Sequence, residues 1–206
     1  LWDRYPVEQV ATPEGYQRDP ALVINFYNER RKQLLKVKPN RGHELLAELE
    51  KNFHVTVVTQ NIDNLHERAG SSHIIHLHGE LTKVCSSRDP HNPHYIKELK
   101  PEEYEVKMGD KAGDGTQLRP FIVWFGEAVP EIETAIQYVE KADIFVIIGT
   151  SLNVYPAAGL LHYVPRGAEV YLIDPKPVDT HTSRSIHVIQ KGASEGVAEL
   201  KQLLGV

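Results

Sequence analysis

Cysteine is nearly absent from this sequence. The 206 residues include a single cysteine, Cys85, so the chain can form no internal disulfide. A zinc site built from four cysteines is excluded for the same reason. The fold must therefore be stabilised by packing and hydrogen bonding, within a chain long enough to bury a full core.

Long hydrophobic runs and an excess of positive charge are also missing. The longest apolar run, 144–148, has the length of a strand and falls far short of the ~20 residues that span a membrane. The first residues lack the hydrophobic stretch of a signal peptide. The formal net charge is −5, which disfavours broad electrostatic binding to nucleic acid. We expect a cytoplasmic protein that binds neither nucleic acid nor membranes.

Strand-like and helix-like segments alternate along most of the chain. β-branched and apolar runs predict strands, and the helical spacing of apolar residues, together with capping signals, predicts helices between them. The predicted strands are 55–59, 74–77, 121–125, 144–148, 169–173 and 186–189. The predicted helices are 20–36, one after Asn40, 63–69, 131–141, one after Pro156, and 195–204. This order is typical of an α/β fold, a Rossmann-like parallel sheet with helices on both faces. The polar segment 86–117 interrupts it and predicts a smaller inserted module.

Polar side chains follow the predicted strand 55–59. Gln60, Asn61, Asp63 and His66 come within a few positions of its end. In open parallel sheets, ligands bind at the carboxyl ends of the strands. Asn and Asp also cap helices, so each of these residues taken singly has an ordinary structural explanation.

Histidine follows the next predicted strand, 74–77. At a strand end, His78 can act as a general base near neutral pH, and Gly79 allows a tight backbone turn. Because the chain has 11 histidines, a structural, hydrogen-bonded histidine is the alternative. Two later strands are followed by Gly149-Thr150-Ser151 and by Asp174, residue types suited to a phosphate or a ribose.

Four motifs, taken together and in order, resemble one known family. They are Thr59-Gln60-Asn61-Ile62-Asp63-Asn64-Leu65-His66, Leu77-His78-Gly79-Glu80, Val123-Trp124-Phe125-Gly126-Glu127 and Gly149-Thr150-Ser151. The chain resembles the sirtuins, which are NAD-dependent protein-lysine deacylases. The resemblance runs along the whole sequence and is weakest over 86–117. It implies removal of succinyl, malonyl or acetyl groups from lysine side chains of proteins, with nicotinamide and O-acyl-ADP-ribose as products.

The resemblance also implies a role for individual residues. His78 would be the general base that acts on a ribose hydroxyl. The residues implied to bind NAD are Gln60, Asn61, Ile62, Asp63, Gly149, Thr150, Ser151, Asp174 and Ala193. Asp174 stands where the family usually has Asn, and both residue types can hydrogen-bond to a ribose. The residues implied to pair with the substrate backbone as an added strand are Val123, Trp124, Phe125, Gly126 and Glu127.

The acyl group is implied by a pair of residues in the predicted helix 20–36. Tyr27 and Arg30 are three positions apart and so share a helix face. Arginine can bind a carboxylate with two parallel hydrogen bonds, and tyrosine can add a third. Within the family, a Tyr-x-x-Arg pair on this helix resembles the marker of enzymes that accept succinyl- or malonyl-lysine. Outside that context, a surface arginine beside a half-buried tyrosine is the simpler explanation.

The zinc ligands of the family are missing. Most sirtuins hold a structural zinc ion with four cysteines, which would fall between residues 81 and 118. Only Cys85 is present there, and His91 and His94 could complete no more than a partial ligand set. We therefore expect no metal site.

The Gly-rich loop that binds the NAD phosphates at the start of the family pattern is also missing. Nothing comparable precedes Trp2, so the deacylase expectation assumes that the parent protein supplies this segment. A non-catalytic acyl-lysine or nucleotide-binding module and an ADP-ribosyl transferase remain the alternatives. The implied domains are 1–39 as the helical part of a small domain, 40–80 with 119–206 as the NAD-binding domain, and 81–118 as the equivalent of the zinc module.

Overall fold

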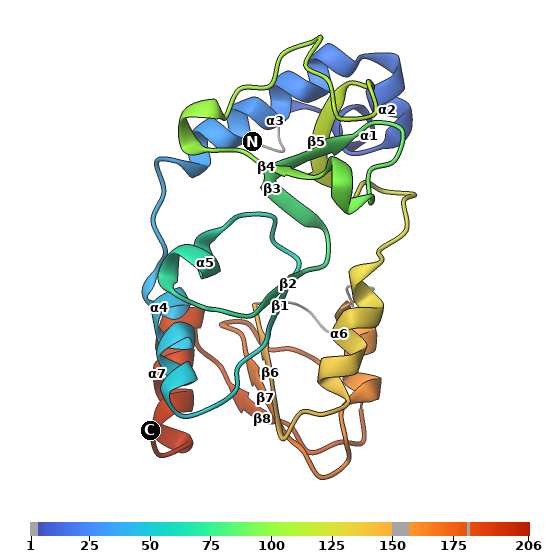
Figure 1. The fold of residues 1–206 in the computed structure, drawn as a ribbon. Helices are drawn as coiled ribbons and strands as arrows, with labels where there is room; N and C mark the ends of the chain where they lie inside the picture. Colours follow the sequence, from blue (N-terminus) through green and yellow to red (C-terminus); the bar gives the residue numbers. More distant parts are fainter. Residues whose placement is uncertain (1–3, 150–156, 181) are drawn as a thin grey trace. The chain divides into compact units, whose positions relative to one another are not determined.

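The computed structural model describes residues 4–149, 157–180 and 182–206, and the chain divides into two compact units (Figure 1). Unit 1 contains the described residues up to Lys38, together with Asn61–Asn64 and His76–Val129. Unit 2 contains Pro39–Gln60, Leu65–Ile75 and the described residues from Pro130 onward.

A parallel sheet forms the centre of unit 2. Its strands β6 (Ile144–Ile148), β7 (Glu169–Ile173) and β8 (His187–Ile189) lie in the order β6-β7-β8. The register places Ile148 opposite Ile173, and Ile173 opposite Ile189. The three strands predicted for this part of the chain are therefore confirmed, and their carboxyl ends share one edge of the sheet.

Helices cover this sheet in unit 2 (Figure 1). Helices α4 (Arg41–Glu48) and α7 (Ala193–Leu203) pack together against the sheet, and α6 (Glu131–Val139) also belongs to this unit. The buried cluster between helices and strands consists of Leu45, Tyr171, Ile173, Ile189, Val197 and Leu200. Gly196 has no room for a side chain, because a Cβ there would lie 2.2 Å from Cγ2 of Ile173. Helix α7 can therefore approach β7 directly.

Shorter elements complete unit 2. Strand β1 (Val57–Thr59) pairs with β2 (Ile74–His76), so the predicted strand 55–59 is shorter than expected. The helix predicted over 63–69 is α5 (Leu65–Ala69). The described residues that follow Pro156 form a 3₁₀-helix, η5 (Ala157–Tyr163), and a second one, η2 (Leu49–Lys51), follows α4.

Three helices open unit 1: α1 (Val7–Val10), α2 (Pro13–Arg18) and α3 (Pro20–Leu34). The side chain of Asp19 accepts a hydrogen bond from the amide of Leu22, and Pro20 occupies the first helical position, as the sequence predicts. Even α3, with 15 residues, is too short and too polar to cross a membrane, and the same holds for every helix in the described residues.

An antiparallel sheet forms the rest of unit 1, in the order β4 (Lys97–Glu98), β3 (Gly79–Ser86) and β5 (Leu118–Ile122). The sequence did not predict β3. The predicted strand 121–125 was wrong at its end, because β5 ends at Ile122 and the chain turns after it. Short 3₁₀-helices, η3 (Pro93–Tyr95) and η4 (Pro101–Glu103), lie in the inserted segment.

Pairing between β3 and β5 also shifts the domain boundaries. Residues 61–64, 76–80 and 119–129, which we expected in the NAD-binding domain, group with unit 1, where β3 and β5 form one sheet. The boundary between Lys38 and Pro39 lies within one residue of the expected one. Helix α3 packs on this sheet through a buried cluster that contains Ile24, Val84 and Val106.

Candidate active site

His78 lies between β2 and β3, where the backbone of unit 1 is tightly constrained. Its carbonyl accepts a hydrogen bond of 2.9 Å from the amide of Val123. The next residue, Gly79, has φ +88°, and a Cβ there would lie 2.2 Å from the carbonyl oxygen of Phe121. Burial lowers the pKa of the His78 imidazole below its ordinary value of 6.5. The ring is therefore neutral near pH 7 and can accept a proton.

The segment Asn61–Asn64 belongs to the same unit and is held by its backbone. The carbonyl of Asn61 lies 3.0 Å from Nδ1 of His76, and the carbonyl of Ile62 accepts a hydrogen bond of 2.8 Å from the amide of Leu81. These contacts connect Asn61 and Ile62 to residues on both sides of His78 in the sequence.

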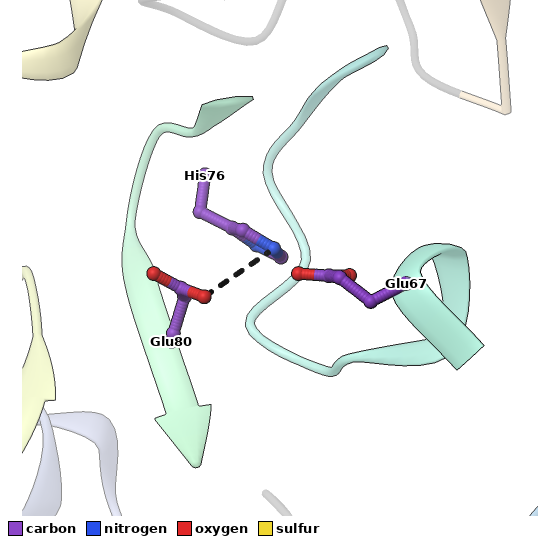
Figure 2. Close-up of side chains that lie close together, drawn as sticks. All are labelled: Glu67, His76 and Glu80. Atoms are coloured by element: carbon purple, nitrogen blue, oxygen red, sulfur yellow. Dashed lines mark ion pairs between the residues drawn. The ribbon is translucent and has the colours of Figure 1, made fainter. Parts of the chain in front are cut away.

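His76 is a residue of this site that the sequence did not single out. Only 8% of its surface is exposed, and its Nε2 lies 3.9 Å from Oε1 of Glu80 (Figure 2). Oε2 of Glu80 accepts a hydrogen bond of 2.8 Å from Nζ of Lys83. Glu67, drawn in the same view, belongs to unit 2. The sequence feature that could have identified His76 is its polar side chain within the otherwise apolar run 74–77.

The segment Val123–Glu127 forms a turn after β5. The amide of Glu127 donates to the carbonyl of Trp124, and Gly126 has φ +90°, a conformation that favours glycine. Three more amides are engaged within unit 1: Val123 with the His78 carbonyl, Trp124 with Oε1 of Glu127, and Phe125 with the Ala11 carbonyl. The groups of this segment that can pair with a peptide are therefore mainly carbonyls.

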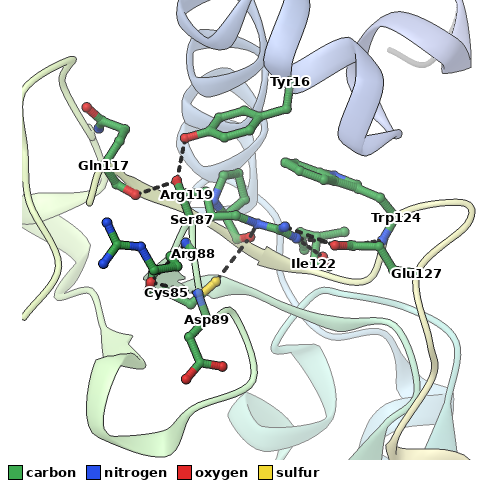
Figure 3. A network of polar contacts seen from close by, with 12 residues as sticks. Tyr16, Cys85, Ser87, Arg88, Asp89, Gln117, Arg119, Ile122, Trp124 and Glu127 are labelled. Atoms are coloured by element: carbon green, nitrogen blue, oxygen red, sulfur yellow. Dashed lines mark hydrogen bonds and ion pairs between the residues drawn. The ribbon is translucent and has the colours of Figure 1, made fainter. Parts of the chain in front are cut away.

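A buried ion pair holds this turn in place. Arg119, 4% exposed, binds the Glu127 carboxylate with two hydrogen bonds of 3.0 and 3.1 Å (Figure 3). Its guanidinium carbon lies 3.8 Å from the centroid of the Trp124 ring, and Nη2 also donates to the Ile122 carbonyl. The Arg119 side chain therefore holds the turn by an ion pair, by stacking on Trp124 and by hydrogen bonds.

Glu127 is committed to this network. Burial raises the pKa of its carboxyl, but the hydrogen bond and charge of Arg119, helped by the Trp124 amide, lower it below the ordinary value overall. The carboxylate is thus ionised and bound inside the protein. Its contribution to the segment is to fix the turn, and Phe125, 69% exposed, is the side chain of the turn that faces solvent.

Tyr27 is fully buried beneath the turn, so it is not the half-buried tyrosine of the simpler alternative. Its hydroxyl donates to the carbonyl of Val10 at 2.9 Å and accepts from Nε1 of Trp124 at 3.0 Å. Burial raises the pKa of this hydroxyl to about 12. Its only proton is therefore engaged with the backbone. Arg30, one turn further along α3, is partly buried, with its guanidinium carbon 5.7 Å from the centroid of the Phe26 ring.

Unit 2 carries the remaining residues expected to bind NAD. Gly149 follows β6 with φ +64°, and Asp174 follows β7 at the same edge of the sheet. Oδ1 of Asp174 accepts a hydrogen bond of 2.8 Å from the Lys176 amide. Ala193 begins α7, and Gln60 follows β1. The carboxyl ends of these parallel strands thus carry turns, a carboxylate and the start of a helix. Such groups can hydrogen-bond to the hydroxyl and phosphate groups of a nucleotide. Thr150 and Ser151 lie outside the described residues.

Cys85 is enclosed in unit 1 rather than exposed in the inserted segment. Its Sγ lies 3.7 Å from the carbonyl oxygen of Pro120, and burial raises the pKa of the thiol to about 12 (Figure 3). A cysteine binds zinc as its thiolate. Within the described residues, Cys85, His91 and His94 do not come together as a group of three ligands.

Hydroxyl and carboxylate groups connect the two ends of the inserted segment. Oγ of Ser86 donates to Oδ2 of Asp114 at 2.5 Å and accepts from the amides of Arg88 and Asp89. Asp114 also accepts from the hydroxyl of Thr116 at 2.7 Å. These bonds lower the pKa of the Asp114 carboxyl to about 2. A network of hydrogen bonds thus joins the two ends of the segment in which the family has its zinc ligands.

The profile of the Sir2 family matches residues 1–156. The chain belongs to the Sir2 family. It is 94% identical over 204 residues to the NAD-dependent protein deacylase of Bacteroides thetaiotaomicron, covering 99% of this chain and 87% of that one. It is 46% identical over 200 residues to the NAD-dependent protein deacylase of Helicobacter pylori, covering 97% of this chain and 85% of that one.

Solved structures of Sir2 homologues share the fold of this Sir2 chain. A Sir2 homologue in complex with NAD superposes with a TM-score of 0.84 at 33% identity, over all of this chain and 80% of the other. A Sir2 complex with a p53 peptide and NAD⁺ gives 0.74 at 28% identity, over 93% of this chain and 81% of the other. The Rossmann-like α/β fold expected from the sequence is therefore confirmed.

Proposed function

We propose that this Sir2 chain catalyses the NAD-dependent removal of acyl groups from lysine side chains of proteins. The observation that carries the proposal is the neutral, half-buried His78, whose carbonyl holds the amide of Val123. The relatives named NAD-dependent protein deacylase support the activity, and the homologues solved with NAD or with a peptide support both substrates.

His78 acts as the general base. When bound, NAD would supply the ribose carbon to which the acyl oxygen of the modified lysine bonds as nicotinamide leaves. The His78 imidazole accepts a proton from a ribose hydroxyl, so that this oxygen can attack the acyl carbon. The bond between the acyl carbon and the lysine nitrogen breaks and one water molecule is consumed, so that free lysine and O-acyl-ADP-ribose are the products.

Each unit carries residues that we assign to NAD binding. In unit 1, Asn61, Ile62 and Asp63 line the nicotinamide and its ribose. Asn61 is tethered through its contact with His76, and Ile62 through its hydrogen bond with Leu81. Gln60 is also assigned to the nicotinamide and its ribose. The residues assigned to the rest of NAD are Gly149, Thr150, Ser151, Asp174 and Ala193.

The peptide pairs with the segment Val123–Glu127. Since the amides of Val123, Trp124 and Phe125 are engaged inside unit 1, carbonyl groups of the segment accept hydrogen bonds from the peptide amides. Arg119 and Glu127 keep the turn in the conformation that makes this pairing possible.

Arg30 selects acyl groups that end in a carboxylate. Succinyl- and malonyl-lysine carry such a group, and an unpaired carboxylate in a partly buried pocket is costly. Because the Tyr27 hydroxyl donates to Val10, Arg30 supplies the positive charge, and Tyr27 shapes the pocket wall. A cytoplasmic location, no zinc and no nucleic-acid partner complete the proposal.

Product identification tests this function. The full-length protein is incubated with succinyl-, malonyl- and acetyl-lysine peptides, with and without NAD, and the products are identified by mass spectrometry. Release of nicotinamide together with O-acyl-ADP-ribose supports the proposal. Binding of peptide or NAD without nicotinamide release would indicate a binding module, and ADP-ribose attached to protein would indicate a transferase.

A further inference from the structure

The tautomer of His76 is fixed by its contact with Asn61. Nδ1 of His76 lies 3.0 Å from the backbone carbonyl of Asn61. A carbonyl oxygen can only accept a hydrogen bond, so Nδ1 must carry the proton. The other ring nitrogen, Nε2, then faces Oε1 of Glu80 at 3.9 Å (Figure 2).

Glu80 and Lys83 lie beside this ring. The Glu80 carboxylate lies on the Nε2 side of the His76 ring, and its second oxygen accepts a hydrogen bond of 2.8 Å from Lys83. The 3.9 Å contact pairs opposite charges only when the ring carries a proton on both nitrogens, and Nδ1 carries a proton in that form too. His76, 8% exposed, is therefore restrained by burial and by its contact with Asn61.

The neighbouring residue Ile62 is tethered independently. Its carbonyl accepts from the amide of Leu81, and the carbonyl of Leu81 accepts from Nε of Arg31 at 2.8 Å. Arg31 is 3% exposed and donates also to Asn28 and to the Tyr104 carbonyl. The Ile62 tether thus rests on α3, and the His76 side chain contacts the backbone of Asn61.

We propose that His76 is a positioning residue for NAD, because it fixes the backbone of Asn61 and thereby the side chains of Asn61 and Asp63. The inference rests on the proposed function, which assigns these residues to the nicotinamide ribose. The contacts described for His76 are with Asn61 and Glu80, away from the residues assigned to the peptide. Loss of His76 therefore raises the KM for NAD and leaves the KM for the acylated peptide unchanged.

Two amide substitutions separate positioning from a merely structural role. In His76→Asn the side-chain amide can occupy the place of Nδ1 and still donate to Asn61, whereas in His76→Gln the amide reaches the place of Nε2 instead. We expect His76→Gln to raise the KM for NAD about tenfold, the effect of about one lost buried hydrogen bond. We expect His76→Asn to stay within about twofold of wild type, and both variants to keep the wild-type KM for peptide.

Equal KM values for NAD in the two variants, or a parallel rise in the KM for peptide, would overturn the inference. A measurement on the unmodified protein covers the case in which a variant does not fold. Nitrogen-15 NMR of the histidine side chains should show His76 with its proton on Nδ1, and a proton on Nε2 alone would contradict the proposal. If wild type releases no nicotinamide, the proposed function fails, and the NMR result together with ADP-ribose affinities of the variants still decides the role of His76.

Discussion

The carbonyl of His78 accepts a 2.9 Å hydrogen bond from the amide of Val123. This bond joins the proposed general base to the first residue of the proposed peptide-binding segment. Gly79 allows β3 and β5 to approach each other beside it, since any side chain there would collide with the Phe121 carbonyl. The spacing between base and peptide is therefore set by the backbone rather than by flexible side chains.

Activity should fall at acid pH with a midpoint below 6.5. Burial lowers the pKa of His78, and a general base works in its neutral form, so activity is present above this pKa and is lost as the pH falls through it. The measurement is kcat/KM from about pH 5 to about pH 8. His91→Ala, at an exposed histidine, should leave the profile unchanged. An acid limb centred above 6.5 would contradict the environment described for His78.

Arg30→Met should change the choice of acyl group. Losing a hydrogen bond to a charged group costs about 1.5–3 kcal/mol, so kcat/KM for a succinyl peptide should fall roughly 10- to 100-fold. Acetyl-lysine has no carboxylate, and its kcat/KM should change far less. The quantity to compare is the ratio of the two values in the wild type, in Arg30→Met and in Lys32→Met, an exposed position on the same helix. A ratio that Arg30→Met leaves unaltered would mean that Arg30 has only a structural role.

Purified protein should contain no stoichiometric zinc. Cys85 is a buried, protonated thiol, and zinc binds thiolates. Elemental analysis after expression in zinc-supplemented medium is the direct check, and treatment with a chelator should leave the Tm unchanged. One zinc ion per chain would show that Cys85 and neighbouring histidines do form a site.

The hydrogen bonds of Asp114 with Ser86 and Thr116 should make the free energy of unfolding depend on pH in the acid range. The Asp114 pKa is about 2 in the folded protein against an ordinary value of 3.8, so its contribution is present above about 3.8 and is lost as the pH falls to about 2. The free energy of unfolding should therefore decrease less between about pH 5 and about pH 2 in Asp114→Asn than in wild type. Asp143→Asn, an exposed position in unit 2, serves as the control. If the free energy of unfolding decreases equally in wild type and in Asp114→Asn, the Asp114 carboxylate is not stabilised as described.

Local patterns predicted the parallel sheet and the helix starts. The apolar run of β6 and the caps Asp19 and Asn40 depend on neighbouring residues only, and each is found where expected. Strand β3 was missed because it contains Glu80, Thr82 and Lys83, and its pairing partner β5 lies more than 30 residues further along the chain. Pairing over such a separation is decided by the tertiary fold and leaves little trace in local sequence.

Residue types at strand ends predicted His78 and the Asn61–Asp63 segment as candidate site residues, but not what holds them. His76 and Arg119 act through partners that are distant in sequence or that are backbone carbonyls. Helical spacing correctly placed Tyr27 and Arg30 on one helix. It could not show that the hydroxyl of Tyr27 would donate to Val10, a residue from another helix.

Turnover of an acylated peptide with NAD, compared between wild type and His78→Ala, tests the central claim most directly. Nicotinamide release is the readout, and the Tm of each protein is measured alongside. Removal of a general base should lower kcat by ~10²–10⁴ while the Tm stays close to that of wild type, and His91→Ala should behave as wild type. Near-normal turnover in the folded His78→Ala protein would contradict the proposed mechanism.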